Sequence, residues 1–345
     1  MSNTKVRVGI VGAGIVGGLD GRSDSHAGGY VRCEEVDVVA VADINEERLQ
    51  QFGDKWEIAP EHRYTSMDAM FEKMKPDIVS VTTDNFHHHQ PVIAAAEAGV
   101  KVILVEKPLA ISVEKGRQMC AVCENNGARL ITDHTRRFLP HFRKLQKLVK
   151  DGELGKVKTI TENGCRPLLH CGTHDVDRAF MFTDAEPKLV AGAINDEEVA
   201  DPGGAGMILC EGGVVIFVNC VGERKEYYGG AVITGSEGRL EFNEPYSLWR
   251  LGRLKVGGRS YGHEYVFEDI PDMPKEWDLS DYFYCAMREA VDCLLEDREG
   301  VSTGRDGLRA LELIVGMHIS HQTQTMVPLP LDKSMETLEI RSTGK

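Results

Sequence analysis

A glycine pattern directly after the first apolar run is the feature that most constrains how this chain can fold. Residues 5–11 are typical of a buried strand, and they lead into Gly12-Ala13-Gly14-Ile15-Val16-Gly17, a G-x-G-x-x-G sequence. In a dinucleotide-binding fold the first glycine makes a tight turn, the second lets the backbone approach a pyrophosphate, and the third lets the helix pack on the strand. Taken alone, the pattern also fits a glycine-rich turn that binds no ligand.

Strands and helices alternate through the first 133 residues. Helices are expected to begin near residues 66, 91 and 112, and apolar strands are expected at residues 36–42, 63–64, 77–83, 101–105 and 129–131. Nearly continuous apolar strands separated by helices indicate a parallel sheet that is covered on both faces. The sequence therefore predicts an α/β fold in which residues 1–133 form a doubly wound Rossmann domain that binds NAD.

Asp43 stands at the end of the second predicted strand. A carboxylate at this place can accept hydrogen bonds from the adenosine ribose hydroxyls, and it repels a 2′-phosphate. No arginine follows at once, because Arg48 lies farther along the next helix, so NAD is favoured over NADP as the cofactor. The alternative is that Asp43 only caps the helix that begins near Asn45. Residues 18–25 form an apparent insertion behind the glycine loop, placed to cover the cofactor or reach the substrate.

The second part of the chain, residues 134–345, has a different pattern. Short strand-like runs follow one another at residues 157–162, 207–209, 214–218, 231–233 and 240–242. Gly212-Gly213 and residues 235–238 are hairpin-type turn signals, and helices are expected at residues 281–295 and 304–322. Strands in series after an alternating domain predict a C-terminal α+β domain with a large, open and mostly antiparallel sheet.

Composition and charge exclude several classes of protein. The formal net charge of −14 over 345 residues argues against nucleic acid and against an anionic membrane surface as partners. No apolar run approaches the roughly 20 residues of a membrane-spanning helix. The first strand begins within a few residues of the start, so no signal peptide is expected. Nine scattered cysteines suit reduced thiols in a cytoplasmic protein.

Several motifs occur in the order found in the Gfo/Idh/MocA oxidoreductases. They are the glycine loop, Asp43, residues 83–88, Glu106-Lys107-Pro108, residues 136–138, His174 with Asp177, and a closing segment at residues 305–331. Over essentially its whole length the chain resembles this family, which includes glucose-fructose oxidoreductase and inositol 2-dehydrogenase. The resemblance implies NAD(P)-dependent redox chemistry on sugars, cyclitols or related polyols, a second domain for substrate binding and subunit packing, and homodimers or homotetramers.

Two residues are expected to act on the proton of the reacting hydroxyl. Hydride transfer from a secondary alcohol needs a base for the hydroxyl proton and a cation beside the oxygen. Lys107 follows the fifth strand at the edge where open α/β sheets bind ligands, and the resemblance implies this role for it, together with a cis peptide bond to Pro108. His174, in the pattern Gly172-x-His174-x-x-Asp177, is the expected general base. Without the motifs, a solvated lysine and a structural histidine are the ordinary interpretations.

His170 departs from the family pattern, since inositol-type members carry an aspartate at this position. We therefore expect His170 to contact the substrate or to belong to a proton relay of different construction. His170, Cys171 and His174 also suggest a metal site, but no carboxylate or second motif at ligand spacing supports one, and no metal is expected. Cys120-x-x-Cys123 lies within a predicted helix and is interpreted as structural.

The remaining expected contacts follow from the resemblance and from the position of each residue. Cofactor contacts are expected at Thr82, Thr83, Asn85, His88, Glu106 and Lys107, and substrate contacts at Asp177, Thr135, Asn163 and Arg166. The predicted function is hydride transfer between NAD and a secondary hydroxyl or ketone of a sugar, cyclitol or sugar derivative. A glycoside-processing enzyme with tightly held NAD and a non-catalytic NAD(P)-sensing regulator are the alternatives on the same scaffold.

Overall fold

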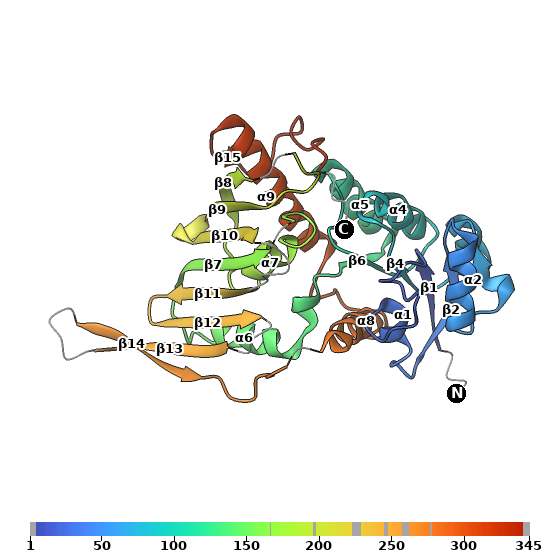
Figure 1. Cartoon of the computed structure of the whole chain (residues 1–345), viewed down its shortest axis with the longest axis horizontal. Coiled ribbons are helices and arrows are strands. Elements are labelled where there is room, and N and C mark those ends of the chain that lie inside the picture. The colour runs from blue at the N-terminus through green and yellow to red at the C-terminus, as the bar shows by residue number, and fades with distance from the viewer. Residues whose placement is uncertain are drawn as a thin grey trace. The chain divides into compact units, whose positions relative to one another are not determined.

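A computed structural model of the chain describes residues 5–165, 167–195, 198–222, 229–244, 248–256, 262–276 and 278–340. The expected substrate contact Arg166 lies outside these described residues. The chain divides into two compact units (Figure 1). The first contains the described residues 5–139 and 278–308, and the second contains residues 140–276 and 309–340.

The first unit contains a six-stranded parallel sheet in the order β3-β2-β1-β4-β5-β6. Its strands are β1 Val6–Val11, β2 Val36–Ala42, β3 Arg63–Tyr64, β4 Ile78–Val81, β5 Val102–Val105 and β6 Arg129–Thr132. Its longer helices are α2 Glu46–Lys55, α3 Met67–Met74, α4 His89–Glu97, α5 Val113–Asn126 and α8 Leu279–Leu295, and α1 is the short helix His26–Tyr30. The strand order reverses between β1 and β4, which is the switch point of a doubly wound fold, so the predicted Rossmann architecture is confirmed.

Local capping explains where the helices of this unit begin and end. The side chain of Ser66 accepts a hydrogen bond from the backbone N–H of Ala69 at the start of α3, and Ser112 does the same for α5. Gly127 ends α5 in the left-handed conformation, with φ of 66°. These are the start and stop signals of the sequence, and the predicted positions agree with the structure.

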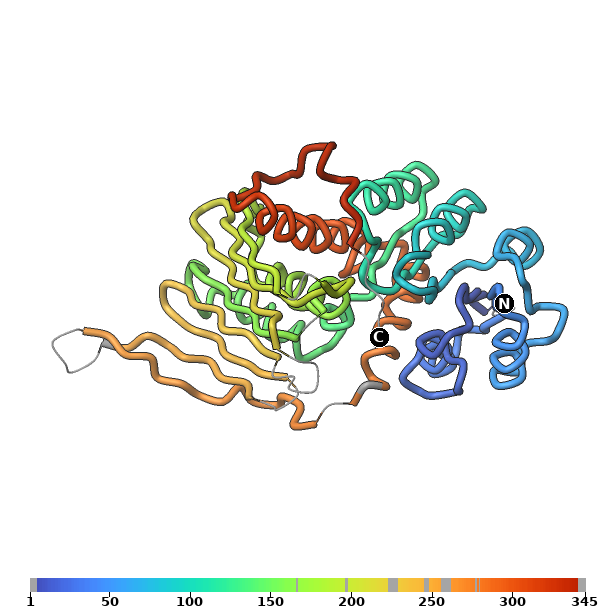
Figure 2. The backbone as a smooth tube through the Cα atoms, turned by 45° about the horizontal axis from the view of Figure 1, so that its top comes forward, coloured from blue at the N-terminus to red at the C-terminus, as the bar shows by residue number. Residues whose placement is uncertain are grey.

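Helix α8 belongs to the first unit, although the sequence-based division placed it in the second domain. It packs beside α1, as the tube of Figure 2 shows. Its apolar side chains, including Met287 and Val291, join the same core as Tyr30. The helix follows the second sheet in the chain, so its hydrophobic face alone does not say which sheet it covers.

The second unit contains a nine-stranded sheet in the order β14-β13-β12-β11-β7-β10-β9-β8-β15. Its strands are β7 Val157–Cys165, β8 Pro187–Ile194, β9 Gly204–Cys210, β10 Val215–Gly222, β11 Gly229–Gly235, β12 Gly238–Glu244, β13 Leu248–Val256, β14 His263–Asp269 and β15 Val327–Pro328. Strands β7 and β10 pair in parallel, and the other described pairs are antiparallel, which confirms the predicted mostly antiparallel sheet.

One face of this sheet packs against α6 Pro140–Lys150, α7 Thr173–Ala179 and α9 Gly304–Thr323, the last of which begins in the first unit. Phe142 of α6 stacks edge-on against Phe242, and the Ser320 hydroxyl of α9 accepts a hydrogen bond from the backbone of Gly192. The opposite face carries half-exposed apolar side chains, among them Phe217 and Val221 of β10. Strict alternation along β10 therefore separates a helix-covered face from an open one.

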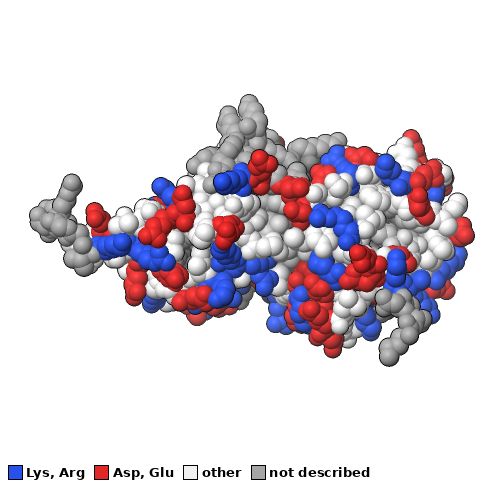
Figure 3. Space-filling view, turned by 90° about the horizontal axis from the view of Figure 1, so that it is seen from below, with Lys and Arg blue, Asp and Glu red and all other residues white. Residues whose placement is uncertain are grey.

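The face of the chain drawn in Figure 3 carries both signs of charge. In the view of Figure 3, lysine and arginine are interspersed with aspartate and glutamate over the whole visible face. No helix within the described ranges is long and apolar enough to span a bilayer.

A buried arginine fixes α7 on the second sheet. Arg178 is fully buried, and its guanidinium donates hydrogen bonds to Glu162 at 2.6 Å, Asp175 at 2.9 Å and Glu244 at 3.0 Å. Burial raises the pKa of Glu162 to about 8, and the neighbouring Arg178 only partly offsets that effect. The cluster therefore contains more acidic groups than its one cation can keep ionised.

Replacement of Glu162 by glutamine should stabilise the protein increasingly as the pH rises. A group whose pKa is raised on folding contributes most below its unfolded value of 4.5, and that contribution is lost as the pH rises towards about 8. Glutamine keeps an oxygen acceptor for Arg178 and does not ionise. We expect the gain in Tm of E162Q to be about 2–4 °C larger at pH 8 than at pH 5. Calorimetry of E162Q and of the exposed control E264Q measures this, and equal gains at both pH values would contradict it.

Candidate cofactor and active site

The glycine loop is shaped by contacts inside the protein and leaves open space at its middle glycine. Gly12 has φ of +103°, and a Cβ there would lie 2.7 Å from the backbone of Thr82, while a Cβ at Gly17 would lie 2.4 Å from the Gly12 carbonyl oxygen. A Cβ at Gly14 would meet no atom within 4 Å. The first and third glycines are therefore required by packing, and the second borders the space where a pyrophosphate would lie.

Two threonines at the end of β4 adjoin this loop. The Thr82 hydroxyl donates a 2.6 Å hydrogen bond to the Gly12 carbonyl and so holds the turn in place. The Thr83 hydroxyl oxygen is buried and has no hydrogen-bond partner among the described residues. On the loop itself, Ile15 is 56% exposed and Val16 is 39% exposed. An open backbone, an unpartnered hydroxyl and exposed apolar side chains together fit a dinucleotide cofactor.

Asp43 is tied to the glycine loop by its side chain. One carboxylate oxygen accepts a 2.7 Å hydrogen bond from the backbone N–H of Ala13, and the other accepts one of 2.8 Å from Asn45. The N-cap of α2 is Asn45, so the alternative that Asp43 is itself the cap is wrong. Beside Asp43 the sequence analysis missed Ile44, which is 93% exposed. An apolar side chain exposed at the mouth of a nucleotide site is a signal that only the structure provides.

The extra residues behind the loop pack against α2. The Trp56 indole N–H, just after α2, donates a 2.7 Å hydrogen bond to the Gly18 carbonyl. Gly21 lies against Lys55, so closely that a Cβ would collide with the lysine side chain. His26 and Ala27 then return to hydrogen-bond the carbonyls of residues 16 and 17. Residues 18–25 are therefore held at both ends by hydrogen bonds, at Gly18 to Trp56 and just after residue 25 to the glycine loop.

The Glu106-Lys107-Pro108 loop follows β5 and contains the expected cis peptide bond between Lys107 and Pro108. One Glu106 oxygen accepts a hydrogen bond from the backbone N–H of Lys107 at 3.2 Å. The imidazole Nδ1–H of His88, expected to contact the cofactor, donates at 2.8 Å to the Pro108 carbonyl and is buried. Burial lowers the pKa of His88, which suits a neutral ring that braces the loop.

A histidine that the sequence analysis missed meets Glu106 from the other side. His26, the first residue of α1, places its Nε2 at 3.2 Å from Glu106 and 3.5 Å from Asp133, and its Nδ1 at 3.1 Å from the Ser80 hydroxyl. Tyr30 lies behind, with its hydroxyl 3.0 Å from that of Ser80. His26 and Glu106 are 80 residues apart in the chain, so no local pattern links them.

The pKa values of the two carboxyl groups in this cluster are shifted in opposite directions. Burial opposes ionisation of Glu106, but the hydrogen bond from His26 and the nearby charges lower its pKa to about 2. Burial and the charge of Glu106 raise the pKa of Asp133 well above its ordinary value. Neither Asp133 oxygen has a hydrogen-bond partner among the described residues. Within those residues, His26, Glu106 and Asp133 are also the one group of three possible metal ligands that lie close together.

The second unit positions the other expected catalytic residues. His170 lies in the turn before α7, where Asp201 accepts hydrogen bonds from the backbone N–H groups of Leu169 and His170, both at 2.9 Å. His174 is the second residue of α7 and is partly exposed, and Asp177 lies one turn later and is buried. The Arg178 cluster beneath them holds this short helix on the sheet.

Two expected substrate contacts lie elsewhere. Asn163 alternates with Glu162 on β7 and so faces the open side of the sheet, where its side chain accepts a 3.4 Å hydrogen bond from Asn219. The structure does not bring Asn163 together with His174, because α7 packs on the opposite face. In the first unit, Thr135 begins a short 3-10 turn after β6 and is partly exposed.

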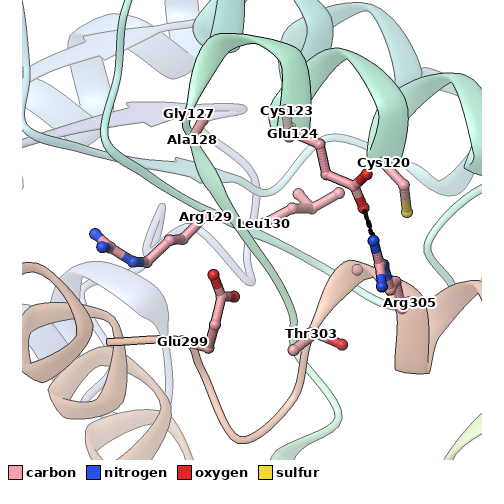
Figure 4. A pocket seen from close by; sticks show the side chains of 11 residues that line it. Cys120, Cys123, Glu124, Gly127, Ala128, Arg129, Leu130, Glu299, Thr303 and Arg305 are labelled. Atoms are coloured by element: carbon pink, nitrogen blue, oxygen red, sulfur yellow. Dashed lines mark hydrogen bonds and ion pairs between the residues drawn. The ribbon is translucent and has the colours of Figure 1, made fainter. Parts of the chain in front are cut away.

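A cavity of about 510 Å³ lies at the other edge of the parallel sheet (Figure 4). Its lining includes Arg129, the first residue of β6, together with the Cys120-x-x-Cys123 pair of α5. Ligands of doubly wound folds bind at the carboxyl ends of the strands, so this cavity is not the dinucleotide site. Burial raises the pKa of Cys120 to about 11 and that of Cys123 to about 12, which suits inert structural thiols.

Comparison with known proteins agrees with this geometry. Residues 6–134 match the model of the Gfo/Idh/MocA family, described as an oxidoreductase family with an NAD-binding Rossmann fold. Over these residues the chain is similar to this family. The matched residues cover the glycine loop, Asp43, Lys107 and Asp133, which are all in the first unit.

Individual relatives extend the likeness beyond the Rossmann part. D-glucoside 3-dehydrogenase of Escherichia coli K12 is 33% identical over 172 residues, which are 50% of this chain and 46% of that protein. D-xylose 1-dehydrogenase [NADP(+)] of Haloarcula marismortui is 24% identical over 279 residues, 73% of this chain and 74% of that protein. The structure of levoglucosan dehydrogenase in complex with NADH superposes with a TM-score of 0.79 at 17% identity, covering 95% of this chain and 100% of the other. The last likeness concerns the fold of both units.

Proposed function

We propose that this protein is an NAD-dependent oxidoreductase that transfers a hydride between the nicotinamide and a secondary hydroxyl or ketone of a sugar, cyclitol or sugar derivative. The observation that carries the proposal is a lysine fixed just past β5 in the same unit as an open glycine loop. The match of residues 6–134 to the family model supports the redox class, and relatives named for glucosides and xylose support a carbohydrate substrate.

The cofactor would be held by the first unit. Its pyrophosphate would lie at Gly14, and the Asp43 carboxylate would accept hydrogen bonds from its adenosine ribose hydroxyls. Bound NAD would supply the hydride acceptor. Ile44 and Asn45, which follow Asp43, offer no cation for a 2′-phosphate. The negative charge of Asp43, with no cation directly after it, favours NAD, although one relative is named for NADP.

The chain's own side chains would handle the proton. The Lys107 ammonium would donate a hydrogen bond to the reacting oxygen and stabilise negative charge there. His174 would take the hydroxyl proton, and His170 and Asp177 would orient the substrate. The proposal places the proton on a histidine whose ordinary pKa is near 6.5, which suits a base at neutral pH.

Replacement of Lys107 by alanine should reduce kcat by about 100-fold or more, because the oxygen would lose its cation. A panel of sugars and cyclitols with NAD, followed by NADH absorbance, measures the rate, and NADH fluorescence measures cofactor binding. The exposed Lys73→Ala on α3 is the control. Near-normal turnover by K107A would contradict the role, and normal NAD binding without turnover of any substrate by the wild type would favour a cofactor-sensing regulator.

Removal of the Asp43 charge should weaken the preference for NAD. In D43A, the ratio of kcat/KM for NAD to that for NADP should fall by about 10-fold or more, because the 2′-phosphate is no longer repelled. The exposed Glu47→Ala on α2 removes one charge without touching the glycine loop and should leave the ratio unchanged. A D43A ratio equal to that of the wild type would mean that Asp43 only braces Ala13.

We also propose that a second copy of the chain covers the open face of the nine-stranded sheet, giving a homodimer or a tetramer. Phe217 is 41% exposed and Val221 is 44% exposed on this face. Exposed apolar side chains that lie together on one face are typical of a protein–protein interface. Phe217→Glu should shift the protein to a smaller species in sedimentation velocity at micromolar concentration. The control is Leu295→Glu, at a residue that is 57% exposed at the end of α8. A wild-type monomer, or an unaltered F217E oligomer, would refute the assignment of this face.

A further inference from the structure

The structure assigns His26 a positioning role: we propose that it holds the Glu106 carboxylate so that this carboxylate braces the backbone of Lys107. The inference rests on the proposed function of Lys107 and deepens it. Glu106 accepts hydrogen bonds on both oxygens, from the imidazole of His26 at 3.2 Å and from the N–H of Lys107 at 3.2 Å. The carboxylate therefore bridges the first helix and the loop that presents the lysine.

The bridge is anchored deep in the unit. His26 is fully buried, and its other ring nitrogen lies 3.1 Å from Ser80, whose hydroxyl also lies 3.0 Å from that of Tyr30. Burial raises the pKa of Tyr30, so this hydroxyl stays neutral. The imidazole is thus fixed in the ring plane from both sides, and its Nε2 must point at the carboxyl groups. A bond held in this way restricts where Glu106, and with it the Lys107 backbone, can move.

Asp133 lies close to Glu106 in the same buried site. The ionisation of Glu106 therefore depends on its hydrogen bond from His26. Two ionised carboxylates this close in a buried site would repel each other, and burial together with the charge of Glu106 raises the pKa of Asp133. The charged or titratable groups that face the pair are His26 from α1, His88 from the segment before α4, Lys107 from the loop itself and Arg136 from the turn after β6. The His26 side chain is hydrogen-bonded to Glu106, and this bond lowers the pKa of that carboxyl group. Without it, burial would favour the protonated form of Glu106 as well.

The experiment compares H26A, H26Q and the matched control H89Q, whose histidine lies on α4 and bonds Gln118. Glutamine can place an N–H near the position of the lost Nε2–H, and alanine cannot. We expect H26A to lower kcat by about 10- to 100-fold with little change in NAD binding. In the pH profile of kcat/KM for H26A, the acid limb should shift to higher pH by about one unit or more. The reason is that a buried Glu106 without His26 is protonated more easily. H26Q should recover most of the rate, and H89Q should behave as the wild type.

A second measurement needs no substrate. Hydrogen exchange at the Lys107 amide, read at residue level by mass spectrometry, should be about 5-fold or more faster in H26A than in the wild type or H26Q. The isosteric variant E106Q should show the same acceleration, and H26A should add nothing to it in the double variant H26A/E106Q. If H26A does not fold, E106Q and H26Q carry the comparison.

Three results would overturn the inference. They are wild-type exchange at Lys107 in H26A, additive effects of H26A and E106Q, and a stoichiometric metal ion in the purified protein that is lost in H26A. Failure of the proposed function is a separate outcome, because it would appear as no turnover with any sugar while the exchange differences persist.

Discussion

Backbone atoms of the glycine loop approach the end of β4 so closely that no side chain fits between them. Gly12 and Gly17 supply this approach, and the 2.6 Å hydrogen bond from the Thr82 hydroxyl to the Gly12 carbonyl holds it. The order of the strands in the sheet reverses between the neighbours β1 and β4. This packing therefore fixes the loop at the carboxyl edge of the strands, at the switch point of the fold. Other polar groups of the first unit's site emerge at this same edge, among them Asp43, Thr83, Glu106 and Asp133 after β2, β4, β5 and β6.

Features with a local cause could be predicted from the sequence. The parallel strands, the serine caps of α3 and α5 and the stop at Gly127 depend on neighbouring residues, and they lie where the patterns indicate. The meeting of His26 with Glu106 depends on chain segments 80 residues apart, and the return of α8 to the first unit depends on which core its apolar face joins. Asn163 shows a third kind of difference. Its residue type suits a sugar contact, but strand alternation turns it away from the face that carries α7.

Two buried clusters with excess acid hold the elements that carry the proposed catalytic residues. Around Arg178, three carboxyl groups surround one guanidinium, and the pKa of Glu162 rises to about 8. Around His26, the pKa of Glu106 falls to about 2 while that of Asp133 rises. In both places burial raises the pKa of one carboxyl group, while Arg178 and Glu106 each keep hydrogen bonds to more than one partner. Such clusters contribute little net stability compared with apolar packing, so their value lies in the single arrangement that they permit. A short helix of seven residues such as α7 has few other means of holding one orientation.

The insertion behind the glycine loop sharpens the argument about His26. His26 and Ala27 donate hydrogen bonds to the carbonyls of residues 16 and 17, at 2.9 and 3.1 Å. The backbone N–H groups of His26 and Ala27 therefore bond carbonyls of the glycine loop itself, although residues 18–25 lie between them in the chain. The free energy of closing such a loop changes only slowly with its length. The position of His26 is accordingly set by the glycine loop and by Ser80, and the exposed charges at residues 20, 22 and 24 are free of that constraint. The loop that leaves room for a dinucleotide at Gly14 thus also determines, through the carbonyls of Val16 and Gly17, the direction from which Glu106 is held.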